Sequence, residues 1–355
     1  MDKIMMVGCD LHDRSMLLKI AIGVASPDKR SWSNDRAGRK AMIADLKRRA
    51  ATVGATRIVF AYEASGLGFT LYDELTASGI ECHVLAPTLM ERSVKHTKGK
   101  TDERDAEGVL QSLRGWLLAG NPLPEVWIPD RQTRDDREVV RMRLEVADKL
   151  TRCKNQIRCL LKRNNVESAP MKPWTGDYDV WLTHQAKSVL SHGAGVALSS
   201  LLRQLEQLES EREVLSGELV KLSQGERYRR PATSLVEQLG GVGVLTAMVF
   251  LTELGDVKRF ANRQQVGSFL GLTPSSFESG EVDDRKGHIT RQGPGRVRKV
   301  LNQAVWSRLR TTPEARAKFD RIAEKNPKHK KKAVVALMRE LGIAMWHKAV
   351  DALAA

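Results

Sequence analysis

The segment Val7-Gly-Cys-Asp-Leu-His12 carries the clearest structural signal in the chain, an apolar run that ends in a carboxylate. The run Ile4–Cys9 has the length and composition of a buried strand, and Asp10 stands at its end. A second run, Arg57–Tyr62, ends in the same way at Glu63. Because a rigid sheet holds side chains at strand ends in fixed positions, the two carboxylates are candidates for one site.

Strands and helices alternate around this segment through the first quarter of the chain. Further strands are expected at Met16–Val24 and Glu81–Leu85, and helices at Ala37–Arg49 and Phe69–Ala77. This order predicts a mixed α/β sheet covered by helices. A helix over Asp102–Leu118 and a proline-bearing stretch complete an expected first domain of residues 1–128.

Two further acids lie at the start of that last helix, in Lys100-Thr-Asp-Glu-Arg-Asp-Ala106. Asp102 and Asp105 are three residues apart, so a helical first turn places them on one face. Any one such acid alone is more often a solvated or capping residue. Four carboxylates together, however, repel one another unless a cation neutralises them, and hard oxygen ligands favour Mg²⁺ or Mn²⁺. We therefore expect Asp10, Glu63, Asp102 and Asp105 to bind divalent metal and to support phosphodiester cleavage.

The charge of the chain indicates a polyanionic partner. Lys and Arg number 58 against 43 Asp and Glu, which gives the 355 residues a net charge of +15. Nucleic acid is the leading partner class for such an excess, and a basic protein without a specialised partner is the alternative.

The cysteines and the apolar runs give no sign of secretion or of a membrane span. Cys9, Cys82, Cys153 and Cys159 have neither CxxC spacing nor a histidine at zinc-finger spacing, so we expect reduced thiols. The longest apolar run, Val242–Leu254, is too short to cross a bilayer. We expect a soluble cytoplasmic protein without a membrane partner.

A long charged helix, Arg131–Arg163, opens an expected second region of residues 129–230. Its apolar stripe lies opposite a basic face that includes Arg143 and Arg152. Such a face contacts nucleic acid or is simply solvated. The segment Glu167–Gly195 is rich in proline, glycine and tryptophan, and we expect it to be irregular.

A heptad pattern begins at Leu198 and predicts a coiled coil, and with it a homo-oligomer, a dimer or a tetramer. The alternative is pairing with the Arg131–Arg163 helix of the same chain. The a and d positions are Leu198, Leu201, Leu205, Leu208, Arg212, Leu215, Leu219 and Leu222.

The remaining residues, 231–355, predict a mainly helical domain with helices near Arg296–Arg308 and Ala333–Ala354. The turn Gly241-Val-Gly243 suits a helix-hairpin-helix that meets a phosphate, or a plain turn between two helices. Four basic residues are candidates to hold phosphates: Lys286, Arg291, Arg296 and Arg298.

The motifs VGCDLH (7–12), FAYEASG (60–66) and KGKTDERDA (98–106) resemble those of the DEDD-type transposases of bacterial insertion sequences. The resemblance continues in LGGVGVLTA (239–247), FLGLTPSSFESG (269–280) and GHITRQGPGRVRKVL (287–301), in the same order. It implies a ribonuclease-H-like first domain, similar to the resolvase RuvC, followed by a helical coiled-coil region and a mainly helical transposase domain. Residues 167–195 match least well.

The resemblance also implies a mechanism and partners. Members of the family are recombinases that act on donor and target DNA, guided by a structured non-coding RNA, the bridge RNA. Their metal-binding tetrad works with a serine that attacks DNA and forms a phosphoserine, which corresponds here to Ser279. Without the resemblance, Ser279-Gly280 would be taken as a turn. The implied location is the bacterial nucleoid.

Three other functions fit parts of the sequence. A structure-selective, RuvC-like endonuclease would use the same tetrad with metal-activated water as nucleophile. An actin-like ATPase needs a second glycine-rich phosphate motif, and the Ser65-Gly66 pair is no substitute for it. A non-catalytic nucleic-acid-binding protein would not need all four acids and the serine.

Overall fold

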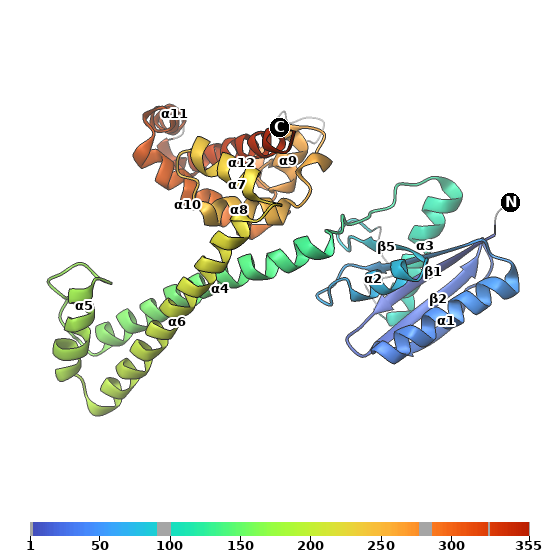
Figure 1. Ribbon diagram of the computed structural model, residues 1–355, viewed down its shortest axis with the longest axis horizontal. Helices are drawn as coiled ribbons and strands as arrows, with labels where there is room; N and C mark the ends of the chain where they lie inside the picture. Colours follow the sequence, from blue (N-terminus) through green and yellow to red (C-terminus); the bar gives the residue numbers. More distant parts are fainter. Residues whose placement is uncertain (1–2, 91–100, 277–285, 326, 355) are drawn as a thin grey trace. The chain divides into compact units, whose positions relative to one another are not determined.

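The fold is described from a computed structural model, over residues 3–90, 101–276, 286–325 and 327–354. The chain forms two compact units, residues 1–128 and 129–355, and each is described by itself (Figure 1). None of the helices in these ranges is long and apolar enough to cross a membrane.

The first unit is built on a five-stranded sheet in the order β3-β2-β1-β4-β5. β1 pairs with β2 antiparallel and with β4 parallel, so the sheet is mixed, as the sequence predicts. The four expected strands are confirmed, and β3 was not expected because its polar residues leave no apolar alternation to detect. The strands are β1 (Ile4–Leu11), β2 (Ser15–Ile22), β3 (Asp28–Ser33), β4 (Arg57–Glu63) and β5 (Glu81–Leu85).

Helices cover both faces of this sheet (Figure 1). α1 (Arg36–Val53) and α2 (Thr70–Ala77) pack on one face, in a hydrophobic cluster that includes Val7 and Cys9 of β1. α3 (Asp102–Ala119) packs on the other face, in a cluster that includes Met6 of β1 and Val59 and Ala61 of β4. This α/β arrangement is consistent with the expected ribonuclease-H-like fold.

The second unit begins with a long antiparallel hairpin of α4 (Arg131–Arg163) and α6 (His192–Gln224) (Figure 1). Leu198, Leu205 and Leu219, all heptad a positions, are buried in it, whereas the d positions are partly exposed. The heptad leucines therefore pack within one chain, which was the alternative to pairing between chains. A homo-oligomer stays a prediction.

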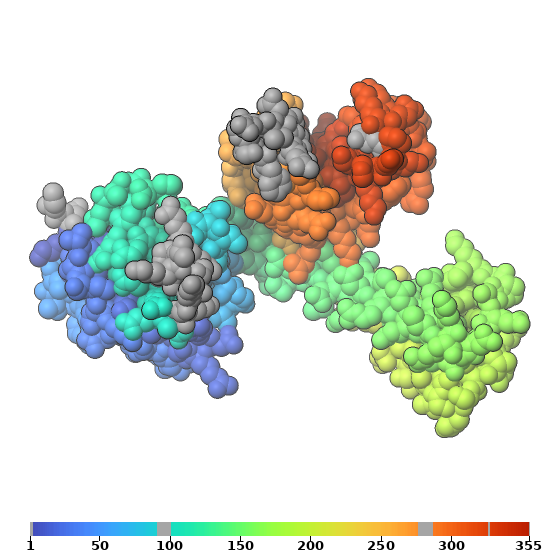
Figure 2. All heavy atoms as spheres, turned by 180° about the vertical axis from the view of Figure 1, so that it is seen from behind, coloured from blue at the N-terminus to red at the C-terminus, as the bar shows by residue number. Residues whose placement is uncertain are grey.

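The segment at the far end of the hairpin is more regular than expected. It forms α5 (Gly176–Trp181) and a π-helical turn, Leu182–Ala186, and buries Tyr178 and Trp181 against the ends of α4 and α6. Figure 2 shows this end as a lobe of its own in the second unit. The expectation of irregular structure over residues 167–195 was wrong for this part, because two aromatic anchors order a segment that has no helical periodicity.

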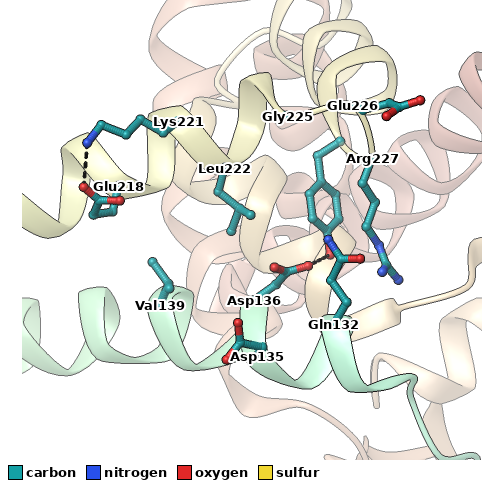
Figure 3. Close-up of a pocket in the computed structure, with 11 residues that line it drawn as sticks. Gln132, Asp135, Asp136, Val139, Glu218, Lys221, Leu222, Gly225, Glu226 and Arg227 are labelled. Atoms are coloured by element: carbon teal, nitrogen blue, oxygen red, sulfur yellow. Dashed lines mark hydrogen bonds and ion pairs between the residues drawn. The ribbon is translucent and has the colours of Figure 1, made fainter.

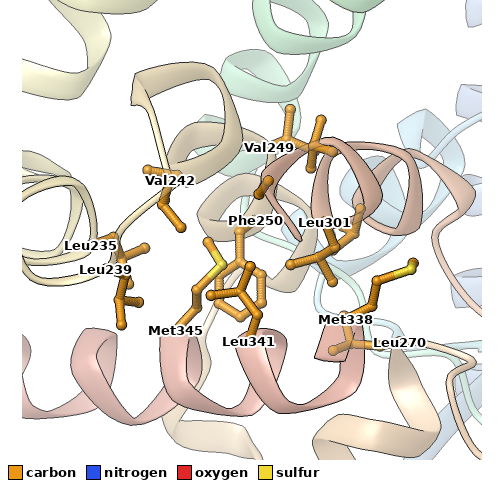
Figure 4. Packing of buried hydrophobic residues seen from close by; sticks show 14 of the residues in the cluster. Leu235, Leu239, Val242, Val249, Phe250, Leu270, Leu301, Met338, Leu341 and Met345 are labelled. Carbon is orange, nitrogen blue, oxygen red and sulfur yellow. The ribbon is translucent and has the colours of Figure 1, made fainter. Parts of the chain in front are cut away.

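The C-terminal helices pack around one hydrophobic core, in which Leu235, Phe250 and Met345 lie close together (Figure 4). The same core includes Val140 of α4 and Leu219 of α6, at the base of the hairpin. This core therefore crosses the expected boundary at residue 230. The elements are α7 (Arg229–Gln238), α8 (Val244–Leu254), a 3₁₀ turn (Val257–Arg259), α9 (Arg263–Phe269), β6 (Pro274–Ser276), β7 (Lys286–Ile289), α10 (Gly295–Thr311), α11 (Pro313–Glu324), a 3₁₀ turn (Pro327–His329) and α12 (Lys331–Ala354).

The glycine turn between α7 and α8 packs inside this core. Gly241 has a φ of +83°, and a Cβ there would stand 2.6 Å from the carbonyl oxygen of Ala304 on α10. Glycine is thus needed both for the backbone conformation and for the close approach. The contact favours a plain turn packed on α10 over a phosphate-binding hairpin at Gly241.

Candidate metal centre

The sheet places Asp10 and Glu63 next to each other in its register. The parallel pairing of β1 and β4 ends at Cys9 and Tyr62, and the two acids come directly after this pair. Met6 of β1 and Ala61 of β4 pack against α3, and side chains alternate along a strand, so both acids belong to the α3 face. The strand-end pattern therefore predicted their common location.

The first turn of α3 brings the other two acids to the same face. Thr101 is the N-cap residue, and its side chain accepts a hydrogen bond from the backbone N–H of Arg104. Asp102 and Asp105 follow in that turn, where carboxylates stabilise the helix dipole. β1 and α3 can approach closely because position 8 is glycine: a Cβ there would stand 2.4 Å from the carbonyl oxygen of Ala106.

A histidine that the sequence reasoning did not select lies among these acids. His12 Nε2 is 2.9 Å from Asp10 Oδ2 and 3.4 Å from Asp102 Oδ1. One ligand atom from each of these three residues lies within 4.8 Å of the other two. Two carboxylate oxygens and an imidazole nitrogen at this spacing fit a divalent cation. Glu63 and Asp105 are described residues but do not belong to this three-residue cluster.

The electrostatics of Asp10 reflect its crowded position. Burial raises the pKa of its carboxyl group, the charges of Asp105 and Asp102 raise it further, and His12 acts in the opposite direction. Asp10 is the least exposed member of the cluster, with 15% of its side chain accessible, against 62% for Asp102. A cation bound here would relieve the repulsion between the acids.

A pair of lysines holds the same turn of α3 from the sheet side. Lys19 Nζ of β2 lies 2.6 Å from Glu103 Oε1, and Lys29 Nζ of β3 lies 2.7 Å from Glu103 Oε2. These contacts lower the pKa of Glu103 to about 2. Glu103 is therefore directed to the sheet edge, between the two aspartates of the candidate site.

A polar hollow lies beside the cluster. Its walls come from the turn between β1 and β2 and from the residues that follow β4. It opens next to His12, so the cluster borders a surface that a ligand can reach. The lining residues are Leu11, His12, Asp13, Arg14, Ser15, Ser65, Gly66 and Leu67.

Comparison with known proteins identifies the family. A profile described as a transposase, of the DEDD type of IS110, matches residues 7–165, and one described as the transposase IS116/IS110/IS902 family matches residues 233–320. A candidate transposase of Sinorhizobium fredii, y4rJ, is 30% identical over 334 residues, which cover 88% of this chain and 83% of that protein. The chain belongs to the IS110 family of transposases.

Two other relatives support the assignment of this transposase to the family. The S. fredii candidate transposase y4qE is 28% identical over 307 residues, covering 85% of this chain and 71% of that protein. The transposase for insertion sequence element IS1533 of Leptospira borgpetersenii is 26% identical over 249 residues, 69% of each chain. DNA is therefore a partner of this protein, and the expected family is confirmed.

The basic residues selected from the sequence differ in whether their side chains are engaged within the fold of the transposase. Arg143 Nε donates to Ser216 Oγ at 2.8 Å inside the α4–α6 hairpin. Arg298 Nη1 donates to the carbonyl oxygens of Leu270 and Gly293. Both guanidinium groups thus support the fold, whereas the other four basic residues are exposed or have side chains outside this description. Arg152, Arg291 and Arg296 are exposed, and nothing is described for the side chain of Lys286.

Ser279, the expected nucleophile, lies outside the described residues. The strands on either side of it, β6 and β7, pair antiparallel, with Pro274 opposite Ile289. Ser275 Oγ, in β6, donates to the carbonyl oxygen of His288 in β7. Ser275 is therefore engaged in this small sheet.

Proposed function

We propose that this transposase cuts and rejoins DNA strands at the acidic cluster of its first unit, with Mg²⁺ or Mn²⁺ as the ion. The observation that carries the proposal is the convergence of Asp10 and Asp102, with His12, within 4.8 Å on one face of the sheet. Asp105 acts electrostatically on Asp10, and Glu63 ends β4 on the same face.

The four acids Asp10, Glu63, Asp102 and Asp105 would hold the metal in this proposal. Bound there, divalent ions activate an attacking oxygen and stabilise a leaving one. The protein's part is to keep the carboxylates in place before the ion arrives. Three features of the first unit support this: the parallel register of β1 and β4, the N-cap at Thr101, and the close approach at Gly8.

Ser279 is proposed as the nucleophile of strand exchange. Its Oγ would form a bond to the scissile phosphorus while one P–O ester bond breaks, and the leaving oxygen would take up a proton as the serine loses one. The hydroxyl group of a second strand would then reverse this step, so the number of phosphate ester bonds is conserved. The support is the motif around Ser279 and the family match over residues 233–320.

The proposed partners are donor DNA, target DNA and a structured guide RNA, bound by a dimer or tetramer. The charge distribution supports a polyanion-binding role for the second unit. Residues 129–355 contain 40 Lys and Arg and 27 Asp and Glu, so they carry +13 of the +15 net charge. Counterion release by such a surface favours nucleic acid without regard to sequence.

The test of the metal-dependent function is strand exchange by single variants of the acids. Asp10→Asn, Glu63→Gln, Asp102→Asn and Asp105→Asn are each expected to lower the exchange rate at least about 100-fold, because a ligand to the ion is lost. Glu107→Gln, on the same helix, serves as the matched control and should retain activity. Full activity in any one of the four acid variants would contradict a shared metal site.

The serine and the guide RNA are tested separately. Ser279→Ala should abolish both exchange and the covalent protein–DNA adduct that denaturing gels detect in the wild type. Cleavage that persists in this variant, with no adduct in the wild type, would establish the hydrolytic endonuclease instead. RNA that co-purifies with the protein, expressed with its native flanking DNA, should be encoded by the element. Absence of such RNA would exclude the guided mechanism.

A further inference from the structure

We propose that His12 is a ligand of the bound ion, and that its nitrogen donor makes the centre bind Mn²⁺ more tightly than Mg²⁺. This inference rests on the proposed function, because it concerns the same site. It adds a fifth ligand to the four acids. It also predicts a higher affinity for Mn²⁺ than for Mg²⁺, which carboxylates alone would not give.

The distances around His12 suit coordination. Neighbouring ligands of an octahedral ion with bonds of about 2.1 Å are about 3 Å apart. His12 Nε2 lies 2.9 Å from Asp10 Oδ2 and 3.4 Å from Asp102 Oδ1, so the three atoms have the spacing of adjacent corners. His12 lies just past the end of β1, in the turn to β2, and this turn brings its imidazole to Asp10 and Asp102.

The backbone of His12 is held from both sides. Its N–H donates to the carbonyl oxygen of Ser15 at 2.9 Å across the turn between β1 and β2. Its carbonyl oxygen accepts a hydrogen bond from Asn34 Nδ2 at 2.7 Å. Arg39 Nη1 in turn donates to both the backbone and side-chain oxygens of Asn34, and Arg39 pairs with Glu74. This network fixes the turn, so the imidazole reaches the acids from a rigid base.

The identity of the donor determines the preference between the ions. Mg²⁺ favours oxygen ligands and gives up its water reluctantly, whereas imidazole suits the transition metals. A centre with four carboxylates and no nitrogen would discriminate little between Mg²⁺ and Mn²⁺. The alternative role of His12 is an ion pair on the surface, since 46% of its side chain is exposed. In that case His12 would leave the acids when an ion binds.

The experiment compares Mn²⁺ and Mg²⁺ binding to the full-length protein by calorimetric titration. The wild type should bind Mn²⁺ more tightly than Mg²⁺. His12→Ala should weaken Mn²⁺ binding at least about tenfold and Mg²⁺ binding by less than about threefold. His12→Asp, which replaces nitrogen by oxygen, should bind the two ions with nearly equal affinity. His184→Ala, an exposed histidine of the second unit, is the control and should change neither affinity.

A spectroscopic measurement gives a readout that is independent of affinity and activity. Electron spin-echo modulation of Mn²⁺ bound to the wild type should show coupling to a directly bound ¹⁴N nucleus, and His12→Ala should lack it. Bound Mn²⁺ without this coupling would overturn the role of His12, while dependence of binding on Asp10 would leave the proposed function standing. Absence of Asp10-dependent binding of either ion would overturn both.

Discussion

At the scale of single residues, Glu103 shows how a side chain outside the cluster can set its geometry. It stands between Asp102 and Asp105 in the first turn of α3 and contacts Lys19 and Lys29 on two neighbouring strands. Lys19 is only 8% exposed, whereas Glu103 is half exposed, so the carboxylate end of both contacts meets solvent. The two lysine contacts hold the start of α3 against the sheet. They therefore fix how the helix is rotated about its axis, and this rotation sets the direction of the Asp102 and Asp105 side chains.

We expect Glu103→Ala to weaken Mn²⁺ binding several-fold and to change the free energy of unfolding by no more than about 1 kcal/mol. The first effect follows from a freer first turn of α3. The second follows because 47% of the Glu103 side chain is exposed, and ion pairs that water can reach contribute little to stability. Titration of the ion together with urea unfolding separates the two. Glu107→Ala on the same helix is the control, and unchanged Mn²⁺ affinity in Glu103→Ala would exclude a positioning role.

The candidate site was predictable from the sequence only in part. Asp10 and Glu63 end apolar runs, and Asp102 and Asp105 have helical spacing, so a simple pattern identifies each acid. His12 gives no such pattern, because a single histidine after a strand is common. The available signal was its position two residues after Asp10, directly beyond the strand end that carries the carboxylate. The need for glycine at position 8 depends on how close α3 lies, which the sequence does not encode locally.

At the scale of elements, prediction succeeded where the apolar period was strong. The strand Glu81–Leu85 and the helix Arg131–Arg163 have the expected bounds. β3 was missed because an edge strand with one solvated face needs few apolar residues, and its order depends on pairing with β2. The heptad leucines of α6 indicated a helix partner without identifying it, because α4 and a second chain offer similar apolar stripes.

The start of α4 depends on one carboxylate with two functions. Asp130 is the N-cap residue and accepts hydrogen bonds from the N–H and Oγ1 of Thr133. It also pairs with Arg227, which follows α6 and holds the pKa of Asp130 below its ordinary value. Nearby, Tyr228 donates to the buried Asp136 at 2.7 Å, in a pocket between the start of α4 and the end of α6 (Figure 3). These contacts close the base of the hairpin.

We expect Asp130→Ala to lower the free energy of unfolding of the second unit by about 1 kcal/mol at pH 7, the usual cost of a lost N-cap. Asp130→Asn should cost less, because asparagine caps equally well and only the charge pair is lost. A carboxyl group with a lowered pKa stabilises the fold above its ordinary pKa, and this contribution is lost as the pH falls below about 3.9. Urea unfolding at several pH values should show wild type and Asp130→Asn converging in acid. Equal losses for both variants at pH 7 would contradict the capping role.

At the scale of the whole molecule, the positive charge is divided unequally between the units. Residues 1–128 contain 18 Lys and Arg and 16 Asp and Glu, so the unit with the acidic cluster is nearly neutral. The second unit carries most of the positive charge. Salt should therefore weaken nucleic-acid binding mainly through residues 129–355. The carboxylates of the cluster lie in a unit that has almost as many acidic as basic residues.

The hydrophobic cores are divided in the same way. The two clusters of the first unit contain only residues before Pro129, and the two clusters of the second unit contain only residues after it. Leu46 of α1 is a fully buried residue of the first unit's core, and Leu235 of α7 is one of the second unit's core. Because neither core draws on the other unit, each should unfold by its own equilibrium.

We therefore expect Leu46→Ala to lower the stability of the first unit by about 2–5 kcal/mol, the usual cost of a cavity at a buried leucine, and to leave the second unit unchanged. Leu235→Ala is the matched variant and should have the opposite pattern. Amide hydrogen exchange under native conditions measures both units in one sample, through the protection of β1 and of α12. A loss of protection in α12 caused by Leu46→Ala would mean that the units unfold together, and the order of the acidic cluster would then depend on the second unit.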